Sequence, residues 1–187
     1  MIRFQEYLTE AAGKNLHLEH IEDEILNDGI HGGRASINFI QSLRDMLAGT
    51  AKTSVNVSTK WDGAPAIFAG TDPSDGQFFV AKKSVFNKNP ILYKKESDID
   101  VTGDLGEKFK VALKEFSKLD IKVVLQGDLL YTSLDSSIAD HWTFQPNTIM
   151  YAVPKDSDIG KKIAKSKIGI VWHTTYTGDT LEGMTAS

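Results

Sequence analysis

The stretch that says most about the fold is Ser58-Thr59-Lys60-Trp61-Asp62-Gly63-Ala64-Pro65-Ala66. An apolar run at 66–69 follows it, and a second run at 78–81 comes after the turn-forming segment 70–76. We expect these two runs to form an antiparallel β-hairpin. Lys60 and Asp62 would then lie at the mouth of a sheet, where Gly63 lets the backbone approach a ligand closely. A hairpin turn with a surface lysine is the simpler interpretation of the same residues.

Further along the chain, apolar patterning predicts three more strands, at 121–131, 147–153 and 168–175. A helix is expected over 105–119, because apolar residues recur there at helical spacing: Leu105, Phe109, Ala112, Leu113 and Phe116. The polar segment 87–106 indicates a loop or flap. Its aromatic and basic residues suit either a contact with nucleic acid or a solvated surface.

Upstream, the first 50 residues are expected to be helical. Apolar residues at helical spacing predict two short amphipathic helices within 2–8 and 18–26, and a third helix over 35–47 that ends at Gly49. The glycines of 28–33 predict a turn before that third helix. From residue 55 the apolar period changes to two. We therefore predict a helical N-terminal segment, residues 1–50, and an α+β domain, residues 51–187, built on a mostly antiparallel sheet.

Composition excludes several classes of protein. The chain has 187 residues, which suits one domain with an added segment. It has no cysteine, so disulfide scaffolds, cysteine nucleophiles and thiolate zinc sites are excluded. No apolar run approaches the roughly 18 residues of a membrane span, and no membrane partner is expected. The net charge of −4 belongs to residues 1–50; residues 51–187 hold 17 basic and 17 acidic residues, unlike a protein that coats nucleic acid.

Lys60-Trp61-Asp62-Gly63 resembles the Lys-x-Asp-Gly nucleotidyl-acceptor motif of the covalent nucleotidyltransferases, which include DNA ligases, RNA ligases and mRNA capping enzymes. Later segments resemble the following motifs of that superfamily in the right order: 79–84, 123–130, 148–153 and 167–172. The resemblance implies the antiparallel sheet of the ligase adenylation domain. It also implies an ATP-dependent reaction with Mg²⁺, in which Lys60 forms a lysyl-AMP intermediate and passes the AMP to the 5′-phosphate of DNA or RNA.

The same resemblance implies roles for further residues. Asp62 and Gly63 belong to the nucleotide-binding motif, Lys83 would neutralise phosphate charge, and Asp128 would lie near the ribose and the Mg²⁺ ion. Tyr151 matches the aromatic residue that stacks on the purine. His173, at the expected end of the last strand, would project at the same sheet edge as Lys60; a histidine bonded to backbone there is the alternative.

This sequence departs from the superfamily in four respects. Pro65 stands where an arginine is common, and Ile168 stands where a metal-associated glutamate is expected. After Trp172 we identify no strand with the lysines that contact the α-phosphate, and no small OB-fold barrel domain is expected within residues 51–187. These departures motivate an alternative to the ligase function, a catalytically inactive module that binds nucleotide or nucleic acid.

A second resemblance concerns the chain's origin. Residues 17–20, 60–66 and 84–88 resemble uncharacterised proteins of tailed bacteriophages, and the opening residues 4–11 resemble the start of large phage proteins. This implies a protein of the host cytoplasm during phage infection, or a virion-associated protein. We also expect the protein to be a monomer.

Two groups of residues have a functional and a plain interpretation. His17, His20 and Asp23 are spaced to line one helix face as metal ligands, but the surrounding leucines and isoleucines favour an ordinary helix face. His31 suits a nucleotide pocket or a surface turn. The three tryptophans are expected in the core or in a pocket wall.

Overall fold

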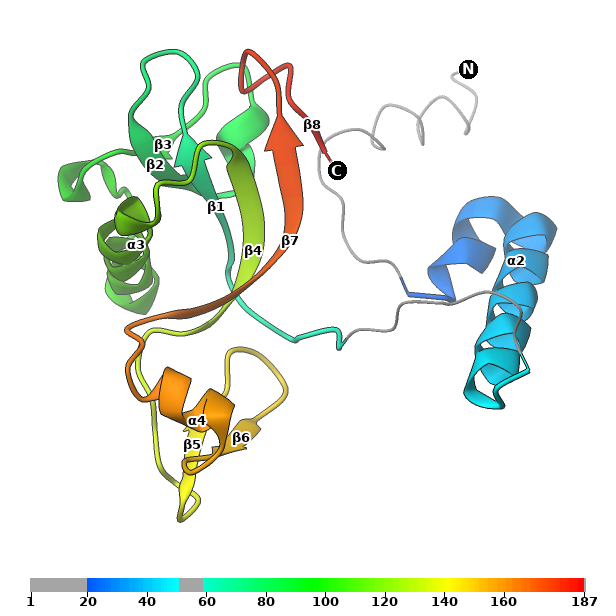
Figure 1. The fold of residues 1–187 in the computed structure, drawn as a ribbon. Coiled ribbons are helices and arrows are strands. Elements are labelled where there is room, and N and C mark those ends of the chain that lie inside the picture. The colour runs from blue at the N-terminus through cyan, green and yellow to red at the C-terminus, as the bar shows by residue number, and fades with distance from the viewer. Residues whose placement is uncertain (1–19, 51–58, 187) are drawn as a thin grey trace. The chain divides into compact units, whose positions relative to one another are not determined.

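The computed structural model describes residues 20–50 and 59–186 (Figure 1). The helix predicted within 2–8, His17 and the start of the strand pattern at residue 55 lie outside the described residues. The described chain forms two compact units. Residues 20–50 with 59–60 make up the helical unit, and residues 61–186 make up the sheet unit.

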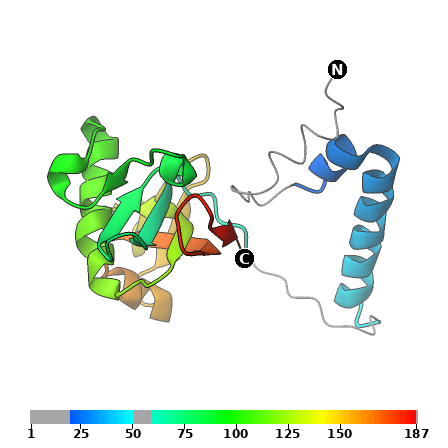
Figure 2. The ribbon, with the colours of Figure 1, turned by 90° about the horizontal axis from the view of Figure 1, so that it is seen from above.

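The helical unit is built on α2, Asp23–Leu47, which bends at Gly29. Gly29 has φ 54° and ψ −125°, a conformation that glycine adopts without strain, so the expected turn at this glycine is confirmed. Figure 2 shows the short segment before the bend and the long one after it. The end of the helix before Gly49 is also as expected, since the Gly49 backbone N–H bonds to the carbonyl of Met46.

The turn predicted at Gly32 and Gly33 is absent. The helix predicted to begin at residue 35 is already part of α2. Both glycines lie inside α2. At Gly32 a β-carbon would lie 1.8 Å from the carbonyl oxygen of Glu24, so this glycine lets the two segments cross closely. The Ser36 hydroxyl donates to the Ile21 carbonyl at 3.0 Å across the same corner.

The two neighbouring glycines are therefore expected to respond oppositely to substitution by alanine. Gly33→Ala should stabilise α2 by about 0.5–1 kcal/mol, because its would-be β-carbon has no described atom within 4 Å beyond the adjoining residues and helix backbone, and alanine favours the helix. Gly32→Ala should instead open the corner and destabilise the unit. Circular dichroism would follow the helix, while fluorescence would follow the sheet unit, which holds all three tryptophans. Equal effects of the two substitutions would contradict the close crossing.

The sheet unit contains a six-stranded sheet in the order β3-β2-β1-β4-β7-β8, with every neighbouring pair antiparallel. Its strands are β1 Ala66–Thr71, β2 Phe78–Ala81, β3 Leu92–Tyr93, β4 Val124–Tyr131, β7 Gly169–Thr177 and β8 Thr185–Ala186. A separate two-stranded sheet pairs β5, His141–Phe144, with β6, Tyr151–Pro154. The helices are α3, Gly103–Phe116, and α4, Asp158–Ile163, with short 3-10 helices η1 Lys83–Phe86, η2 Glu96–Asp98 and η3 Ser117–Leu119.

These elements confirm the expected α+β class, with a mostly antiparallel sheet preceded by a helix. The predicted hairpin is also confirmed, since Thr71 of β1 pairs with Phe78 of β2 across the turn. Among the described residues, no helix has the length and apolarity that a membrane span would need.

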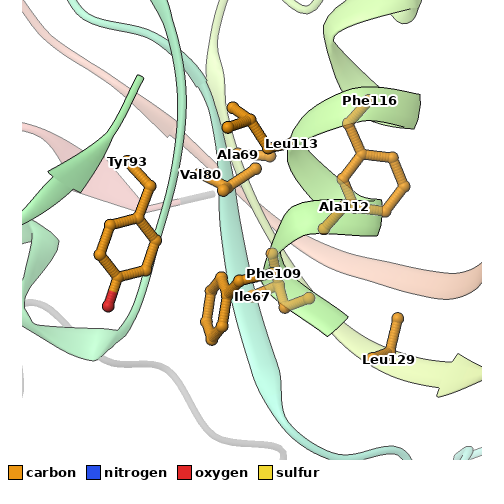
Figure 3. Close-up of a cluster of buried hydrophobic side chains, with 9 residues drawn as sticks. All are labelled: Ile67, Ala69, Val80, Tyr93, Phe109, Ala112, Leu113, Phe116 and Leu129. Atoms are coloured by element: carbon orange, nitrogen blue, oxygen red, sulfur yellow. The ribbon is translucent and has the colours of Figure 1, made fainter. Parts of the chain in front are cut away.

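The core fills both faces of the large sheet. On one face, the apolar side of α3 packs on alternate residues of β1, β2 and β4, as Figure 3 shows for Ile67, Ala69, Val80, Tyr93, Phe109, Ala112, Leu113, Phe116 and Leu129. On the other face lies a second cluster, formed by Phe68, Phe79, Ala81, Val85, Phe86, Val124, Tyr176, Leu181 and Met184. The helical spacing read from 105–119 therefore identified the buried side of α3, except at Leu105, which is exposed.

Two expectations need correction. The strand predicted at 147–153 covers only 151–154, and it pairs with β5 and not with the large sheet. The segment 87–106 is not a flap throughout, because it contains β3, whose Tyr93 is fully buried against Phe109. Burying this ring fixes the segment to the sheet.

Candidate functional site

The tight turn expected at Asp62-Gly63 is absent, because residues 61–64 form no turn and Gly63 lies directly against β4. A β-carbon on Gly63 would lie 2.6 Å from the Cβ of Asp128, so only glycine fits this approach without a shift. Just after Gly63, the Ala64 N–H donates to the Leu129 carbonyl at 2.9 Å, and the Leu129 N–H donates to the Pro65 carbonyl at 3.1 Å. The structure thus brings together two residues, Gly63 and Asp128, that are 65 positions apart.

Asp62 anchors the loop between β5 and β6. Its carboxylate accepts hydrogen bonds from the Asn147 side-chain amide at 3.0 Å, the Thr148 N–H at 3.0 Å and the Ile149 N–H at 3.2 Å. Its own backbone N–H donates to the Tyr151 hydroxyl at 2.7 Å. Through these bonds, Asp62 connects the segment 61–64 to the small sheet.

Tyr151 lies within a run of aromatic rings. Its ring centroid is 5.2 Å from that of Trp61 and 5.4 Å from that of Phe144, and Phe144 in turn contacts Tyr131 at 4.9 Å. Together with the hydroxyl's bond to Asp62, these contacts give Tyr151 a supporting role in the structure. Stacking on a purine, the role implied by the resemblance, requires a ring face open to the ligand.

Asp128 and His173 face each other across β4 and β7. The Nε2 atom of His173 lies 3.8 Å from Oδ1 of Asp128, and the two side chains are 15% and 33% exposed. His173 does not end its strand as expected. It lies inside β7 at an irregularity, since Gln126 pairs with Thr174 while the next residue, Gly127, pairs with Trp172. An extra residue at such a bulge has its side chain redirected, which explains how His173 meets Asp128.

Lys83 lies in η1, shortly after β2. Ala81, the last residue of β2, pairs with Phe68, so Lys83 follows at the end of the sheet where Ala66 pairs with Asp128. Its neighbour Lys82 instead forms an ion pair with Asp100. Lys82 donates to Asp100 at 3.0 Å, and its hydrogen bonds with Tyr93 and Asp100 raise the pKa of its ammonium group.

Lys60 belongs to the helical unit, at its boundary with the sheet unit. Its amine lies 3.3 Å from Nε2 of His20, and both side chains are exposed. His31 is an exposed residue of α2 and not part of a surface turn. The covalent chain places Lys60 two residues before Asp62.

For a Mg²⁺ ion the candidate ligand is the carboxylate of Asp128, because the Asp62 carboxylate already accepts three hydrogen bonds from the β5–β6 loop. Within 20–50 and 59–186 no three histidine, aspartate or glutamate side chains gather closely enough to hold a metal on their own. Mg²⁺ is commonly held by one or two carboxylates together with substrate phosphates, and the partly exposed Asp128 fits that mode. His20 and Asp23 were considered as metal ligands on one helix face. In the structure, the Asp23 carboxylate accepts a hydrogen bond from the backbone N–H of His20 at 2.9 Å.

Sequence reasoning missed Asn147 and Phe144, which support Asp62 and Tyr151. Asn147 belongs to no motif, and its partner is 85 positions away. Phe144 lies on β5, a strand of four residues that is too short for its alternation to be distinctive.

A protein-family model described as a family of unknown function, DUF6267, matches residues 15–187. Comparison with curated proteins and with solved structures gives no significant match.

Proposed function

The chain belongs to DUF6267, a family of unknown function, and we propose that it is an ATP-dependent covalent nucleotidyltransferase of the ligase type. Its sheet unit would correspond to the adenylation domain of those enzymes. The observation that carries the proposal is the packing of Gly63 on Asp128, with a would-be β-carbon 2.6 Å from the Asp128 side chain. The first and third motifs of the resemblance, far apart in sequence, meet at this contact.

In the proposed reaction, the deprotonated amine of Lys60 attacks the α-phosphorus of ATP. An N–P bond forms, the bond from the α-phosphorus to its bridging oxygen breaks, and pyrophosphate leaves with that electron pair. The amine gives up a proton and the lysine carries AMP as a phosphoramidate. An oxygen of the 5′-phosphate of a DNA or RNA strand would then attack the same phosphorus. A P–O bond forms, the N–P bond breaks, and the lysine amine leaves with that electron pair and takes up a proton from water.

The remaining residues would bind and orient the nucleotide. Asp128 would accept a hydrogen bond from the ribose or hold Mg²⁺, while Lys83 and His173 would lie near the phosphates at the same end of the sheet. When bound, the ion would offset charge on the transferring phosphate. Asp62 would hold in place the segment that follows Lys60, through its bonds to the β5–β6 loop.

A second candidate function is a module that binds nucleotide without transferring it. The observation that favours it is the position of Ile168, which is partly buried and packs against the cluster beneath α3. This residue stands where the superfamily places a metal-associated glutamate, so the chain offers an apolar contact in place of a ligand.

Intact mass measured after incubation with ATP and Mg²⁺ tests the proposal. We expect the wild-type chain to gain the mass of one AMP group, and the Lys60→Ala variant to gain none. The matched control is Lys95→Ala, which removes an exposed lysine elsewhere on the sheet unit and should keep the adduct. If the wild-type chain formed no adduct with any of ATP, GTP and NAD, the catalytic proposal would be wrong. Nucleotide binding by calorimetry, unaffected by Lys60→Ala and without an adduct, would select the binding module.

A further inference from the structure

The β5–β6 loop grips the Asp62 carboxylate with three donors that come from consecutive residues. Two are the backbone N–H groups of Thr148 and Ile149, and the third is the side-chain amide of Asn147. Hydrogen bonds to an ionised acceptor are stronger than those between neutral groups. The carboxylate is thus held from several directions by one short segment.

The loop belongs to an element that is not part of the large sheet. An isolated pair of strands is at best marginally stable in water, so β5 and β6 depend on contacts with the rest of the unit. The aromatic run from Tyr131 through Phe144 and Tyr151 to Trp61 supplies an apolar contact, and Asp62 supplies a polar one. Both contacts end on the two residues that directly follow Lys60.

Asn147 is the one member of this grip whose donor is a side chain. Its amide can therefore be removed by substitution without altering the backbone, whereas the amides of Thr148 and Ile149 cannot. The Asn147 side chain is exposed, so its replacement leaves no cavity in the core.

We propose that Asn147 is a positioning residue, which fixes residues 61–63, the segment directly after Lys60, by holding the Asp62 carboxylate in place. This inference rests on the proposed nucleotidyl transfer and adds to it a residue that the motif resemblance does not assign. Asn147 acts through Asp62 and touches neither nucleotide nor metal. Its contribution is to the alignment of the attacking amine, since small displacements of reacting groups lower rates steeply.

The test compares Asn147→Ala with Gln145→Ala. Gln145 lies in the same loop and also carries an amide, but it donates to the carbonyls of Asn147 and Thr148 and not to Asp62. Single-turnover formation of the lysyl-AMP adduct would be measured at saturating ATP, with ATP affinity and thermal unfolding measured in parallel. We expect Asn147→Ala to slow adduct formation on the order of tenfold with little change in ATP affinity or unfolding temperature. Gln145→Ala should match the wild type.

A further variant, Asn147→Asp, places a second carboxylate where the donor was. We expect it to slow adduct formation more than Asn147→Ala does, because like charges then face each other. An unchanged rate in Asn147→Ala, or a rate loss fully explained by weaker ATP binding or unfolding, would overturn the positioning role while the wild-type adduct upheld the proposed function. No adduct on the wild-type chain would overturn the proposed function itself, and the positioning role with it.

Discussion

Replacing Lys94 with methionine is expected to destabilise the sheet unit by about 3 kcal/mol, because it leaves a buried carboxylate without its partner. The Lys94 amine lies 2.6 Å from Oδ2 of Asp72 and 2.7 Å from Oδ2 of Asp75, both in the turn that follows β1. Asp72 is only 4% exposed. It also accepts bonds from the N–H and the hydroxyl of Ser74, which do not replace the lost cation.

The pH dependence of this effect follows from the direction of each pKa shift. Burial alone would raise the pKa of Asp72, but hydrogen bonds from Lys94 and Ser74 hold it below its ordinary 3.8. Its stabilising contribution is therefore present above that value and lost as the pH falls through the lowered pKa. Burial would lower the pKa of Lys94, but its bonds to Asp72 and Asp75 raise it above 10.5, so the lysine's contribution persists until strongly alkaline pH. The deficit of Lys94→Met should thus be largest at neutral pH and shrink below about pH 4.

Urea unfolding followed by tryptophan fluorescence at neutral and acid pH would measure that deficit. The neighbouring Lys95→Met is the matched control. Lys95 is 75% exposed and 4.0 Å from the Asp98 carboxylate, so its loss should cost under about 1 kcal/mol. Equal unfolding midpoints for the two variants at neutral pH would contradict the role assigned to Lys94.

Gly63→Ala is expected to cost about 3 kcal/mol as well, at the upper end of what overpacking usually costs. The new methyl group would lie 2.6 Å from the Cβ of Asp128 and 2.9 Å from its carbonyl carbon. Neither atom can move aside by rotating a side chain. Residues 61–64 must therefore move away from β4, which weakens the bonds between Leu129 and residues 64–65. We also expect loss of the AMP adduct, since the proposed nucleotide site is built around this contact.

Unfolding midpoints and the fluorescence of Trp61, which contacts Tyr151, would detect the displacement of residues 61–64. Gly183→Ala provides a control within the same unit. Its methyl group would meet Oγ1 of Thr180 at 2.8 Å, the end of a side chain that can rotate, so a loss below about 1 kcal/mol is expected. Equal stability of the Gly63→Ala and Gly183→Ala variants would contradict the close packing of Gly63 on β4.

Sequence periodicity predicted those parts of the fold in which burial is one-sided and the element is long. In α3, Phe109 and Phe116 recur at helical spacing because one face packs on the sheet. The short strands β1 and β2 were recognised from the turn-forming segment between their apolar runs, whereas β5 and α4 gave too few periods to recognise. For α4 the signals are only those of the helix ends: Ser157, whose hydroxyl accepts the Gly160 N–H, and the charges of Asp158, Lys161 and Lys162 in a six-residue helix.

The glycines misled the prediction where close approach, and not chain reversal, explains their presence. At Gly32 the missing side chain serves the crossing of two helical segments, which a single sequence does not distinguish from a turn. The meeting of Gly63 with Asp128 was implied only by the resemblance. The bonds of Asn147 and Tyr151 to Asp62 were not predicted, because hydrogen bonds between distant segments leave no periodic trace in the sequence.

The strand order also governs when in folding the surroundings of Asp128 are complete. Its strand, β4, pairs on one side with β1, where Ala66 meets Asp128, and on the other with β7, where Tyr176 meets Val124. Both pairings close long loops, which form later than local hairpins such as β1–β2. A chain still being synthesised can therefore form that hairpin early, but it cannot assemble both sides of Asp128 until β7 has emerged from the ribosome.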